Sequence, residues 1–404
     1  MCQIWAEKSA KPGAAMNHDV VILGGGVMGS STAYHLLKAD PSLSIAVFER
    51  DSSYEQASTV LSDGNVRIQF SLEENIRMSQ HMLEVLKTFS DDMETSKSRP
   101  EVSSRCQGNL FLVDAAGKAD AMAGLQTQKA LGCNVEWLDD QVIGERYDVY
   151  QSLGVVGGTL GLDDGSVDPT ALLSGYRAKA IDLGAEFVES AATDLIANNS
   201  KMRGLRLESG DEVRCEQVVL TAGAWSAGLA AGIGIDLPIK PFMRTVYVVS
   251  TPFTSEGLPS VFLPGGIYAI SEAENLWLMG WSRPEDPVGF EFLPGSHQRF
   301  EDLIWPRLVS HLPSFDQLQI ERSWAGLYAV NTLDENAILG EWPTTRGLFL
   351  ATGFSGHGLQ QAPAVGRYLA EVILDAPHEL DLRRFGGQRI LDDKPLREHA
   401  GRII

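Results

Sequence analysis

The sequence predicts an α/β fold with a parallel nucleotide-binding sheet and a second, antiparallel region, and three observations lead to this prediction. Apolar β-branched runs alternate with amphipathic stretches along most of the 404 residues, as they do in α/β proteins. A glycine-rich turn joins the first of these runs to the first amphipathic stretch. Residues 238–322 differ, because they are rich in aromatic residues, β-formers and prolines. We expect this segment to form an antiparallel sheet in a second domain, since a chain of this length forms roughly two to three domains.

Composition and charge exclude several classes of protein. The hydrophobic fraction of 44% and the charged fraction of 21% are ordinary for a globular chain, which excludes a mainly disordered or fibrous one. Asp plus Glu (53) exceed Lys plus Arg (33), which leaves a net charge of −20. Nucleic acid is therefore not an expected partner, because phosphate backbones would repel the chain. The four cysteines, Cys2, Cys106, Cys133 and Cys215, form no C-x-x-C pair, which indicates a reducing compartment and no metal site.

The chain carries no strong membrane or targeting signal. Its longest uncharged run, residues 217–235, contains four glycines, and we interpret it as a strand, a turn and a helix rather than a transmembrane segment. Residues 1–16 lack the apolar centre of a signal peptide and are expected to form an N-terminal tail. They hold no arginine and one glutamate, which is poor for a mitochondrial presequence. We expect a cytoplasmic protein, with the mitochondrial matrix as the alternative.

The first predicted elements form a dinucleotide-binding pattern. Residues 18–23 form a buried strand, and residues 24–29 (GGGVMG) follow the pattern G-x-G-x-x-G and lead into a helix that reaches residue 37. The first glycine permits a tight turn, the second lets a pyrophosphate approach the backbone, and the third lets the helix pack on the strand. The helix N-terminus favours phosphate. A second buried strand, residues 44–49, ends at Glu49, where a carboxylate is expected to bind ribose hydroxyls.

Four later elements continue the alternation of strands and helices. The apolar patterns predict a helix at about 169–183, a strand at 217–220, a strand at 347–351 and a helix at about 361–374. Pro363 would lie in the first turn of the last helix, where its missing N–H group does no harm. The polar residues 91–104 are expected to form a solvated loop.

The nucleotide could be NAD or FAD, and three features favour FAD. No second G-x-G-x-x-G follows a strand, whereas a flavoenzyme reduced by NAD(P)H usually needs two nucleotide sites. Residues 218–226 (VVLTAGAWS) run from a strand into a turn of small residues that a nucleotide could approach. Residues 352–360 (TGFSGHGLQ) lie between a strand and a helix, so a positive helix N-terminus could stabilise a reduced flavin ring.

Five segments carry a resemblance to a known family. They are VVILGGGVMGSSTAYHLL, ERDSSYEQASTVLSDGNVRIQFS, VVLTAGAWSAGLA, WAGLYAVNTLDENAILG and ATGFSGHGLQQAPAVGR, spread over residues 20–367. In these segments the chain resembles the D-amino acid oxidase superfamily of FAD-dependent oxidoreductases, which includes sarcosine oxidase and dimethylglycine dehydrogenase. Its greatest likeness there is to the FAD-dependent oxidoreductase-domain proteins associated with assembly of mitochondrial complex I, and to their bacterial relatives.

The resemblance implies a glutathione-reductase-like FAD-binding Rossmann domain with an inserted mixed-sheet substrate domain, so that the fold is α+β overall. The FAD-binding domain would be discontinuous, with residues 17–90, 150–237 and 325–390. The substrate domain would hold residues 91–149 and 238–324. Residues 1–16 and 391–404 would be terminal tails.

The resemblance also implies which residues bind FAD. The ADP-binding positions match Gly24, Gly26, Gly29, Glu49 and Arg50, with Val27 and Met28 in the same turn. Positions near the pyrophosphate, the ribityl chain and the adenine, and in the second FAD segment, match Ser58, Thr59, Ala192, Gly223 and Trp225. The loop over the pyrimidine edge matches Gly353, Phe354, Ser355, Gly356, His357, Gly358, Leu359 and Gln360. The FAD is expected to be non-covalent, because the family's covalent cysteine and histidine have no counterpart in this chain.

On the substrate side, the resemblance implies that hydride leaves a C–N carbon for the flavin. We choose Arg67 as a contact to a substrate carboxylate or to the flavin edge, with a surface ion pair as the alternative. Tyr268 and Tyr328, with Trp324, are expected to line an aromatic pocket or else to belong to the core of the sheet. His357 would act as an acid or base, or would position its loop.

The sequence therefore predicts an FAD-dependent enzyme that oxidises the C–N bond of a small-molecule amino acid or N-methylated amine. Sarcosine itself is disfavoured, because Gln360 replaces the lysine with which sarcosine oxidases hold the carboxylate. The alternative is a flavoprotein that acts mainly in assembly of a respiratory complex, with little turnover. The electron acceptor would be O2, a quinone or an electron-transfer protein. No lysine lies between Lys240 and Lys394, so slow reoxidation by air is expected unless Arg283 supplies the missing cation.

Overall fold

A six-stranded sheet assembled from distant parts of the chain forms the core of one half of the protein. The computed structural model describes residues 16–398, and the strand order in this sheet is β10-β3-β2-β14-β21-β20. The strands are β2 (Val20–Leu23), β3 (Ile45–Glu49), β10 (Glu186–Glu189), β14 (Gln217–Leu220), β20 (Ile338–Glu341) and β21 (Leu348–Thr352). Neighbouring strands are parallel except for β20 and β21. The predicted parallel sheet is therefore present, with one antiparallel strand at its edge.

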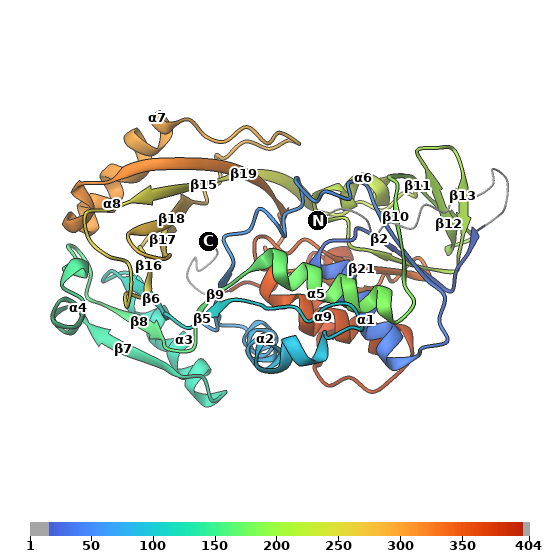
Figure 1. Ribbon diagram of the computed structural model, residues 1–404, viewed down its shortest axis with the longest axis horizontal. Helices are drawn as coiled ribbons and strands as arrows, with labels where there is room; N and C mark the ends of the chain where they lie inside the picture. Colours follow the sequence, from blue (N-terminus) through green and yellow to red (C-terminus); the bar gives the residue numbers. More distant parts are fainter. Residues whose placement is uncertain (1–15, 399–404) are drawn as a thin grey trace.

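Helices cover one face of this sheet, and a four-stranded sheet covers the other (Figure 1). The helices are α1 (Val27–Ala39), α2 (Glu73–Asp92), α5 (Pro169–Asp182) and α9 (Gly358–Ile373). The smaller sheet has the order β1-β13-β12-β11, formed by Met16–Asn17, Glu212–Arg214, Lys201–Leu207 and Ala192–Asn198. Alternate residues of β2 enter the two cores, so that all four of its residues are buried. This double burial explains why β2 is a continuous apolar run.

Close packing of α1 on α9 brings two helix N-termini to the same edge of the sheet. The hydroxyl of Ser31 donates a hydrogen bond to the Ala362 carbonyl at 2.9 Å. A Cβ at position 366 would lie 2.3 Å from the Ser31 Oγ atom, so Gly366 is needed for this approach. Both helices begin beside the carboxyl ends of the parallel strands, which is where open α/β sheets bind ligands.

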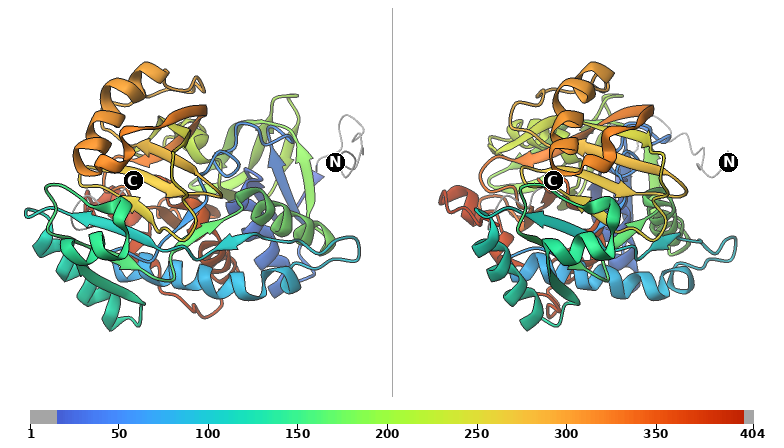
Figure 2. Two further views of the ribbon diagram at one scale, coloured as in Figure 1. Left: turned by 60° about the vertical axis from the view of Figure 1, so that its left-hand side comes forward. Right: turned by 90° about the vertical axis from the view of Figure 1, so that its left-hand side faces the viewer.

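An eight-stranded mixed sheet forms the other half (Figure 2), in the order β19-β15-β18-β17-β16-β6-β8-β7. Its strands are β6 (Asn109–Val113), β7 (Val135–Asp139), β8 (Gly157–Gly161), β15 (Ile239–Ser250), β16 (Ser260–Phe262), β17 (Ile267–Ser271), β18 (Leu276–Trp281) and β19 (Gln319–Asn331). Only the β16–β6 pair is parallel. β8 pairs with β6 and β7, although the predicted boundary at residue 150 assigned it to the FAD-binding domain. Its sequence, GGTLG, has a single large apolar residue, so no apolar pattern marked it as a strand.

Helical segments interrupt the region that was predicted to be an antiparallel sheet. Residues 297–311 form α7 (His297–Arg299), a π-helical turn (Phe300–Ile304) and α8 (Trp305–His311). Phe300, Ile304 and Leu308 are buried against the eight-stranded sheet, and their spacing of four is the helical signal that the prolines concealed. The remaining helices are α3 (Lys118–Ala130), α4 (Asp140–Arg146), α6 (Ser226–Ala231) and α10 (Gln388–Leu391). A three-stranded sheet joins β4 (Asn65–Val66), β9 (Gly165–Val167) and β5 (Ser104–Arg105).

Two long strands, β15 and β19, connect the halves. They have 12 and 13 residues and pair with each other over most of their length, and Figure 1 shows them arching from one half to the other. Ile239, at the start of β15, packs in the core of the six-stranded sheet, whereas Tyr247 and Val249 pack in the core of the other half. Side chains in the middle of β15 therefore lie at the junction of the halves.

The helix at the end of the chain's last βα unit begins earlier than predicted. α9 starts at Gly358 rather than near residue 361, so Pro363 lies inside the helix instead of in its first turn. Pro363 cannot donate the hydrogen bond to residue 359. The extensive burial of α9 against α1 and α2 outweighs that loss, because packing contributes more to helix stability in proteins than local propensity.

The segment after α10 is fastened to the helical half by buried polar groups. The carboxylate of Asp334 accepts hydrogen bonds from the Arg389 Nε–H at 2.8 Å and from the Leu396 N–H at 3.0 Å. The carboxylate of Glu398 accepts from the Leu72 N–H at 3.2 Å, directly before α2. Glu398 therefore caps this helix, where a negative charge is favoured.

The predicted tails are described only in part. Residues 391–398 pack on the protein as above, whereas residues 1–15 and 399–404 lie outside the described residues. Between residues 16 and 398, no helix combines the length and the apolar content needed to span a membrane.

Candidate active site

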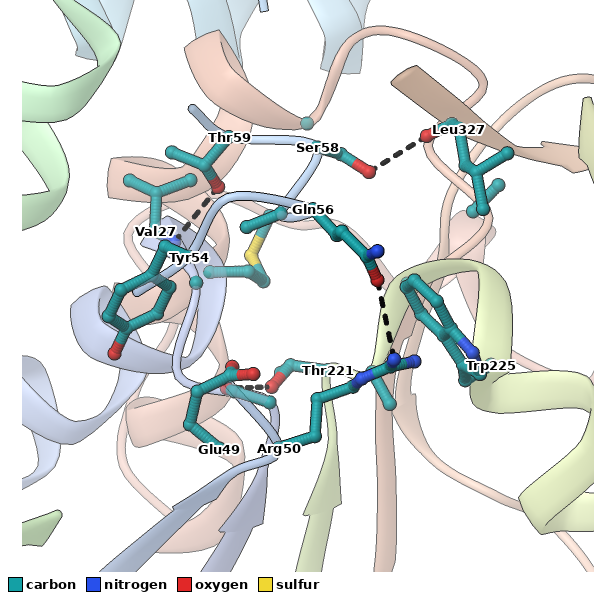
Figure 3. A pocket seen from close by; sticks show the side chains of 18 of the residues that line it. Val27, Glu49, Arg50, Tyr54, Gln56, Ser58, Thr59, Thr221, Trp225 and Leu327 are labelled. Atoms are coloured by element: carbon teal, nitrogen blue, oxygen red, sulfur yellow. Dashed lines mark hydrogen bonds between the residues drawn. The ribbon is translucent and has the colours of Figure 1, made fainter. Parts of the chain in front are cut away.

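A cavity of about 600 Å³ lies at the junction of the two halves. Its first end is formed by the β2–α1 turn and the end of β3, and its second end by β15 and β19. The first end lies at the carboxyl edge of the parallel strands, the usual ligand position in α/β sheets. Volumes of roughly 300–1,000 Å³ are typical of small-molecule and cofactor sites. Figure 3 shows part of this cavity from close by.

The turn between β2 and α1 is shaped by glycines. Gly24 has a φ angle of +103°, and a Cβ on Gly29 would lie 1.9 Å from the Gly24 carbonyl oxygen. The Thr221 hydroxyl donates to the same carbonyl at 2.8 Å, and the Thr59 hydroxyl accepts from the Val27 N–H at 3.2 Å (Figure 3). The turn leaves the positive N-terminus of α1 facing the cavity, where it favours a phosphate.

Glu49 ends β3, and its carboxylate is held against this turn. Its Oε2 atom accepts from the Gly25 N–H at 2.8 Å, and its Oε1 atom accepts from the Asp51 N–H at 3.1 Å. Burial raises the pKa of the Glu49 carboxyl, and the N–H donors oppose this rise. Glu49 also lines the cavity, so its remaining lone pairs can accept hydrogen bonds from ligand hydroxyls.

Arg50 and Trp225 form a flat surface at the same end. The Arg50 guanidinium lies 4.4 Å from the centroid of the Trp225 ring, and its Nη2 atom donates to Gln56 at 3.4 Å (Figure 3). Phe290 stacks on Trp225 at 5.2 Å between ring centroids. Ala192 lines the cavity beside them. Aromatic and guanidinium planes of this kind suit the stacking of a nucleobase.

Backbone groups line the middle of the cavity. Ser355 and Gly356 have φ angles of +52° and +102°, and they lead into α9, whose N-terminus is a second positive helix end. Opposite this loop, a Cβ on Gly223 would meet no atom within 4 Å, because Gly223 borders the open cavity. These positions leave room for a bulky group to approach the backbone closely.

Arg244, from β15, brings a positive charge to the second end of the cavity. It forms an ion pair with Asp286, which also holds Arg299, and it donates to the Arg283 carbonyl at 2.7 Å. Its guanidinium lies 5.6 Å from the centroid of the Tyr328 ring. Its Nε atom is buried and has no acceptor among the described residues. A buried donor without a partner is costly, so a ligand oxygen at this position would be stabilised.

Asp63 brings a carboxylate to the same end. It lines the cavity and accepts hydrogen bonds from the Asn65 N–H at 3.2 Å and from the Tyr268 hydroxyl. Burial raises the pKa of Asp63, and it raises that of Tyr268 well above its usual value. Tyr268 therefore stays protonated and acts as the donor. Tyr268 is 3% exposed and does not line the cavity itself. It can therefore affect a ligand only indirectly, by holding Asp63.

Arg67 and His357 lie behind the cavity wall and contact each other. The Arg67 Nη2 and His357 Nε2 atoms are 3.0 Å apart, and both side chains pack on the Phe70 ring. The Arg67 N–H donates to the Gln360 side chain at 2.8 Å. Burial and the Arg67 charge hold the pKa of His357 well below its usual value, so His357 is neutral and accepts from Arg67. This burial excludes a surface ion pair for Arg67, and it favours loop positioning over acid–base chemistry for His357.

The structure brings together most of the residues predicted to bind a cofactor. Those that line the cavity are Gly24, Gly26, Val27, Met28, Glu49, Arg50, Ser58, Thr59, Ala192, Gly223, Trp225, Phe354, Ser355, Gly356, Gly358 and Leu359. Gly29, Gly353, His357 and Gln360 do not line it. Among the four residues predicted to be catalytic, Tyr328 lines the cavity, whereas Arg67, Tyr268 and His357 do not.

Arg244 and Asp63 were not among the site residues predicted from the sequence. Arg244 is the sole charged residue in the strand-forming run PFMRTVYVVS, and an isolated charge among buried β-formers is a signal of a site. Asp63 precedes Gly64, and Asp-Gly is a common turn sequence. Nothing local distinguishes such a turn residue from one that faces a cavity.

The sequence profile of the DAO family, described as FAD dependent oxidoreductase, matches residues 19–372. The chain belongs to the DAO family. It is 34% identical over 422 residues to FAD-dependent oxidoreductase domain-containing protein 1 of Xenopus laevis, which covers 94% of this chain and 84% of that protein. It is 26% identical over 368 residues to glycine oxidase of Bacillus licheniformis, covering 89% and 94%.

The fold of this DAO-family chain also matches a solved structure. The crystal structure of L-proline dehydrogenase from P. horikoshii superposes with a TM-score of 0.82 at 23% identity, covering 95% of this chain and 100% of that one. The implied fold, with a nucleotide-binding α/β half and a mixed-sheet half, is confirmed.

Family membership confirms FAD as the cofactor, and the cavity fits it. The open position at Gly223, the two positive helix ends and the Glu49 carboxylate match the needs of a dinucleotide. Among the described residues, no cysteine or histidine lines the cavity, which agrees with non-covalent binding. Bound FAD supplies a two-electron acceptor, which the protein chain alone lacks.

Proposed function

We propose that this FAD-dependent oxidoreductase oxidises the C–N bond of an amino acid or an N-alkylated amino acid. The observation that carries the proposal is the pairing of Arg244 with apolar and aromatic side chains at the second end of the cavity. Tyr328, Val246 and Leu61 line that end beside the arginine. A cation on such a wall recognises a small substrate with a carboxylate at one end and an alkyl body.

The surroundings of Arg244 suit it to hold a carboxylate. Asp286 and the Arg283 carbonyl occupy its Nη1 atom and fix the orientation of the guanidinium plane. Arg244 also lines the cavity, so its guanidinium can donate charge-assisted hydrogen bonds to a carboxylate bound there. Charge-assisted hydrogen bonds of this type are about twice as strong as neutral ones.

The other side chains at this end orient the substrate and exclude water. Val246 and Tyr328 cover the cavity from the sheet, and Trp324 packs beside Val246 while its Nε1–H donates to the Leu61 carbonyl at 3.0 Å. When the reacting carbon is held in a fixed position against the cofactor, the oxidation is faster, because the entropy cost of orienting the substrate has already been met on binding. The glycine oxidase relative supports this proposal, because its name places an amino acid in the same kind of site.

The direct test is anaerobic reduction of the purified FAD-containing protein. Amino acids and their N-methylated forms would be mixed with it one at a time, and loss of the oxidised flavin absorbance would be followed. We expect carboxylate-bearing amines to bleach the flavin and the corresponding simple amines to fail. A protein that holds FAD but is reduced by none of these compounds would contradict the proposal and favour an assembly role with little turnover.

A matched pair of arginine variants sharpens this test. Arg244→Met should weaken substrate binding by about 2–5 kcal/mol, because a desolvated charge pair loses one partner. Arg283→Met is the control, since Arg283 lies outside the cavity and pairs with Glu285. The dissociation constants come from the dependence of the reduction rate on substrate concentration. Equal effects of the two variants would remove Arg244 from the substrate site.

A further inference from the structure

We infer that Asp63 is the recognition site for a positively charged substrate nitrogen, so that the cavity selects zwitterions with an alkylated ammonium group. This inference rests on the proposed function, because it assigns the second pole of the same substrate. Arg244 would hold the carboxylate and Asp63 the nitrogen. The evidence is the position of Asp63, its hydrogen bonds and the aromatic groups around it.

Asp63 is a carboxylate at a cavity wall, and no cation among residues 16–398 donates a hydrogen bond to it. Its donors are the Asn65 N–H, at 3.2 Å, its own N–H and the Tyr268 hydroxyl, and none of them carries a charge. Asp63 nevertheless lies within the cavity lining, at the end where Arg244 and Tyr328 are found. A partly buried carboxylate is costly unless a positive charge lies near it; the Arg67 charge acts on Asp63 without donating a hydrogen bond to it, and a ligand cation would supply a charge in direct contact.

Tyr268 holds the Asp63 carboxylate in place from behind. The Tyr268 ring, on β17, lies across Gly280 of the neighbouring strand, where a Cβ would come 2.4 Å from the tyrosine hydroxyl. Any other residue at position 280 would displace the hydroxyl from Asp63. The close packing of β17 on β18 therefore positions the Tyr268 hydroxyl beside the Asp63 carboxylate, which comes from a different segment of the chain.

Aromatic groups near Asp63 favour an alkylated cation over a bare ammonium ion. Tyr328 lines the cavity beside Asp63, and Tyr268 hydrogen-bonds to the carboxylate. Aromatic faces attract quaternary and alkylated ammonium groups, whose charge is spread over apolar methyl groups. The opposite charges of Asp63 and Arg244 match the two poles of an amino acid, and complementary charges select a partner through the penalty on mismatched ones.

Two carboxylates of nearly equal shape test this inference without turnover. Trimethylglycine and 3,3-dimethylbutyrate differ only in having a cationic nitrogen or a neutral carbon at the branched centre. Each would be titrated into the oxidised FAD-containing protein, and the change in the flavin absorbance spectrum would give its dissociation constant. We expect trimethylglycine to bind at least about tenfold more tightly, because it alone meets the Asp63 carboxylate with a charge. Equal binding of the two ligands, or binding of neither, would overturn the inference.

Three variants assign the preference to Asp63. Asp63→Asn should reduce it to less than about threefold, and a preference that persists in this variant would overturn the inference. Glu136→Gln is the charge-matched control, because Glu136 lies outside the cavity and pairs with Arg146, so it should leave the preference unchanged. Tyr268→Phe removes a hydrogen bond but leaves the carboxylate, and should keep the preference. If Asp63→Asn does not fold, the wild-type ligand pair and Tyr268→Phe still decide.

This experiment is independent of the proposed oxidation. It measures binding to the oxidised protein, whereas the proposed function is tested by flavin reduction. A protein that prefers trimethylglycine but is reduced by no amino acid would keep the Asp63 site and lose the proposed reaction. A protein that is reduced by amino acids but shows no preference would keep the reaction and lose the Asp63 site.

Discussion

The two ends of the cavity are built in different ways. At the nucleotide end, backbone groups and helix termini do most of the binding, and they come from short continuous segments such as residues 24–29 and 354–359. At the substrate end, single side chains from separate strands and loops meet, with Asp63, Arg244 and Tyr328 drawn from three of them. Ligand binding at the nucleotide end depends on the shape of the backbone. Ligand binding at the substrate end depends on the identity of each side chain. The nucleotide end should therefore tolerate few changes in backbone shape, whereas the substrate end can change specificity by single substitutions.

The largest effect is expected where a side chain would disturb the backbone of the nucleotide end. Gly29→Ala places a Cβ 1.9 Å from the Gly24 carbonyl oxygen, and inserting atoms into a packed region costs about 1–3 kcal/mol or more. FAD affinity should fall at least about tenfold, measured by titrating the apoprotein. Gly144→Ala in α4 is the control, since its Cβ would meet the Gln151 side chain at 3.4 Å, an ordinary contact. Normal FAD affinity in Gly29→Ala would show that the turn does not need its glycines.

Removal of the Glu49 carboxylate should give the next largest effect. Glu49→Ala removes charge-assisted hydrogen bonds worth about 1.5–3 kcal/mol, so FAD should bind roughly 10- to 100-fold more weakly. The pKa of Glu49 is raised by burial, and the ionised form is the better acceptor. FAD affinity of the wild type should therefore fall as the pH falls through this raised pKa, and that pH step should be absent from Glu49→Ala. Titrations of apoprotein at several pH values measure both effects.

Two histidines, His35 in α1 and His357 directly before α9, should contribute to acid sensitivity. The pKa of His35, in the helical half, is lowered to about 3, and that of His357 is also lowered, mainly by burial. A histidine that is neutral when folded and charged when unfolded stabilises the unfolded state below its ordinary pKa. Each should therefore lower the free energy of unfolding by about 1.4 kcal/mol for each pH unit below ~6.5, until the folded-state pKa is reached.

Substitution isolates the contribution of His357. His357→Gln keeps an acceptor near the position of the Nε2 atom but cannot titrate. Urea unfolding at pH 7 and pH 5 should show that this variant loses less stability on acidification than the wild type, by about 2 kcal/mol. Flavin reduction should change little at pH 7. An identical pH dependence in the two proteins would mean that His357 is not neutral in the folded state.

The smallest expected effect concerns oxygen. Arg244 lines the substrate end, but Asp286, which it shares with Arg299, offsets part of its charge, and no lysine lies between Lys240 and Lys394. Negative charge that develops on oxygen should therefore gain little stabilisation, and air should reoxidise the reduced protein more slowly than a quinone does. Asp286→Asn should speed reoxidation a few-fold by leaving the positive charge unmatched. Stopped-flow mixing of the reduced protein with oxygenated buffer measures this, and fast reoxidation of the wild type would contradict it.

The contrast between the two ends also explains what could be predicted from the sequence. Short continuous sequence patterns contain the parallel strands, the β2–α1 turn and Glu49. Each of these patterns forms its nucleotide contacts from neighbouring residues, so the sequence alone indicates a nucleotide site. Asp63 accepts a hydrogen bond from Tyr268, which lies about two hundred residues later in the sequence. No local sequence pattern predicts a contact between residues so far apart in the chain. Arg67 was predicted to contact the substrate or the flavin edge, and His357 to act as an acid or base or to position its loop, but both lie behind the cavity wall. Strand β8 was missed because glycines replace its apolar residues.

The strand order of the six-stranded sheet also affects how the protein is made. β2 begins at residue 20, and β21, which completes the parallel part of the sheet, ends at residue 352. At ~5–20 residues per second, a ribosome needs roughly 20–60 s to make the chain between them. In the later part of that interval, after residue 220 has been made, the edge of β14 that pairs with β21 has no partner, and unpaired edges can aggregate. The parallel part of the sheet can therefore be completed only after most of the chain has been synthesised.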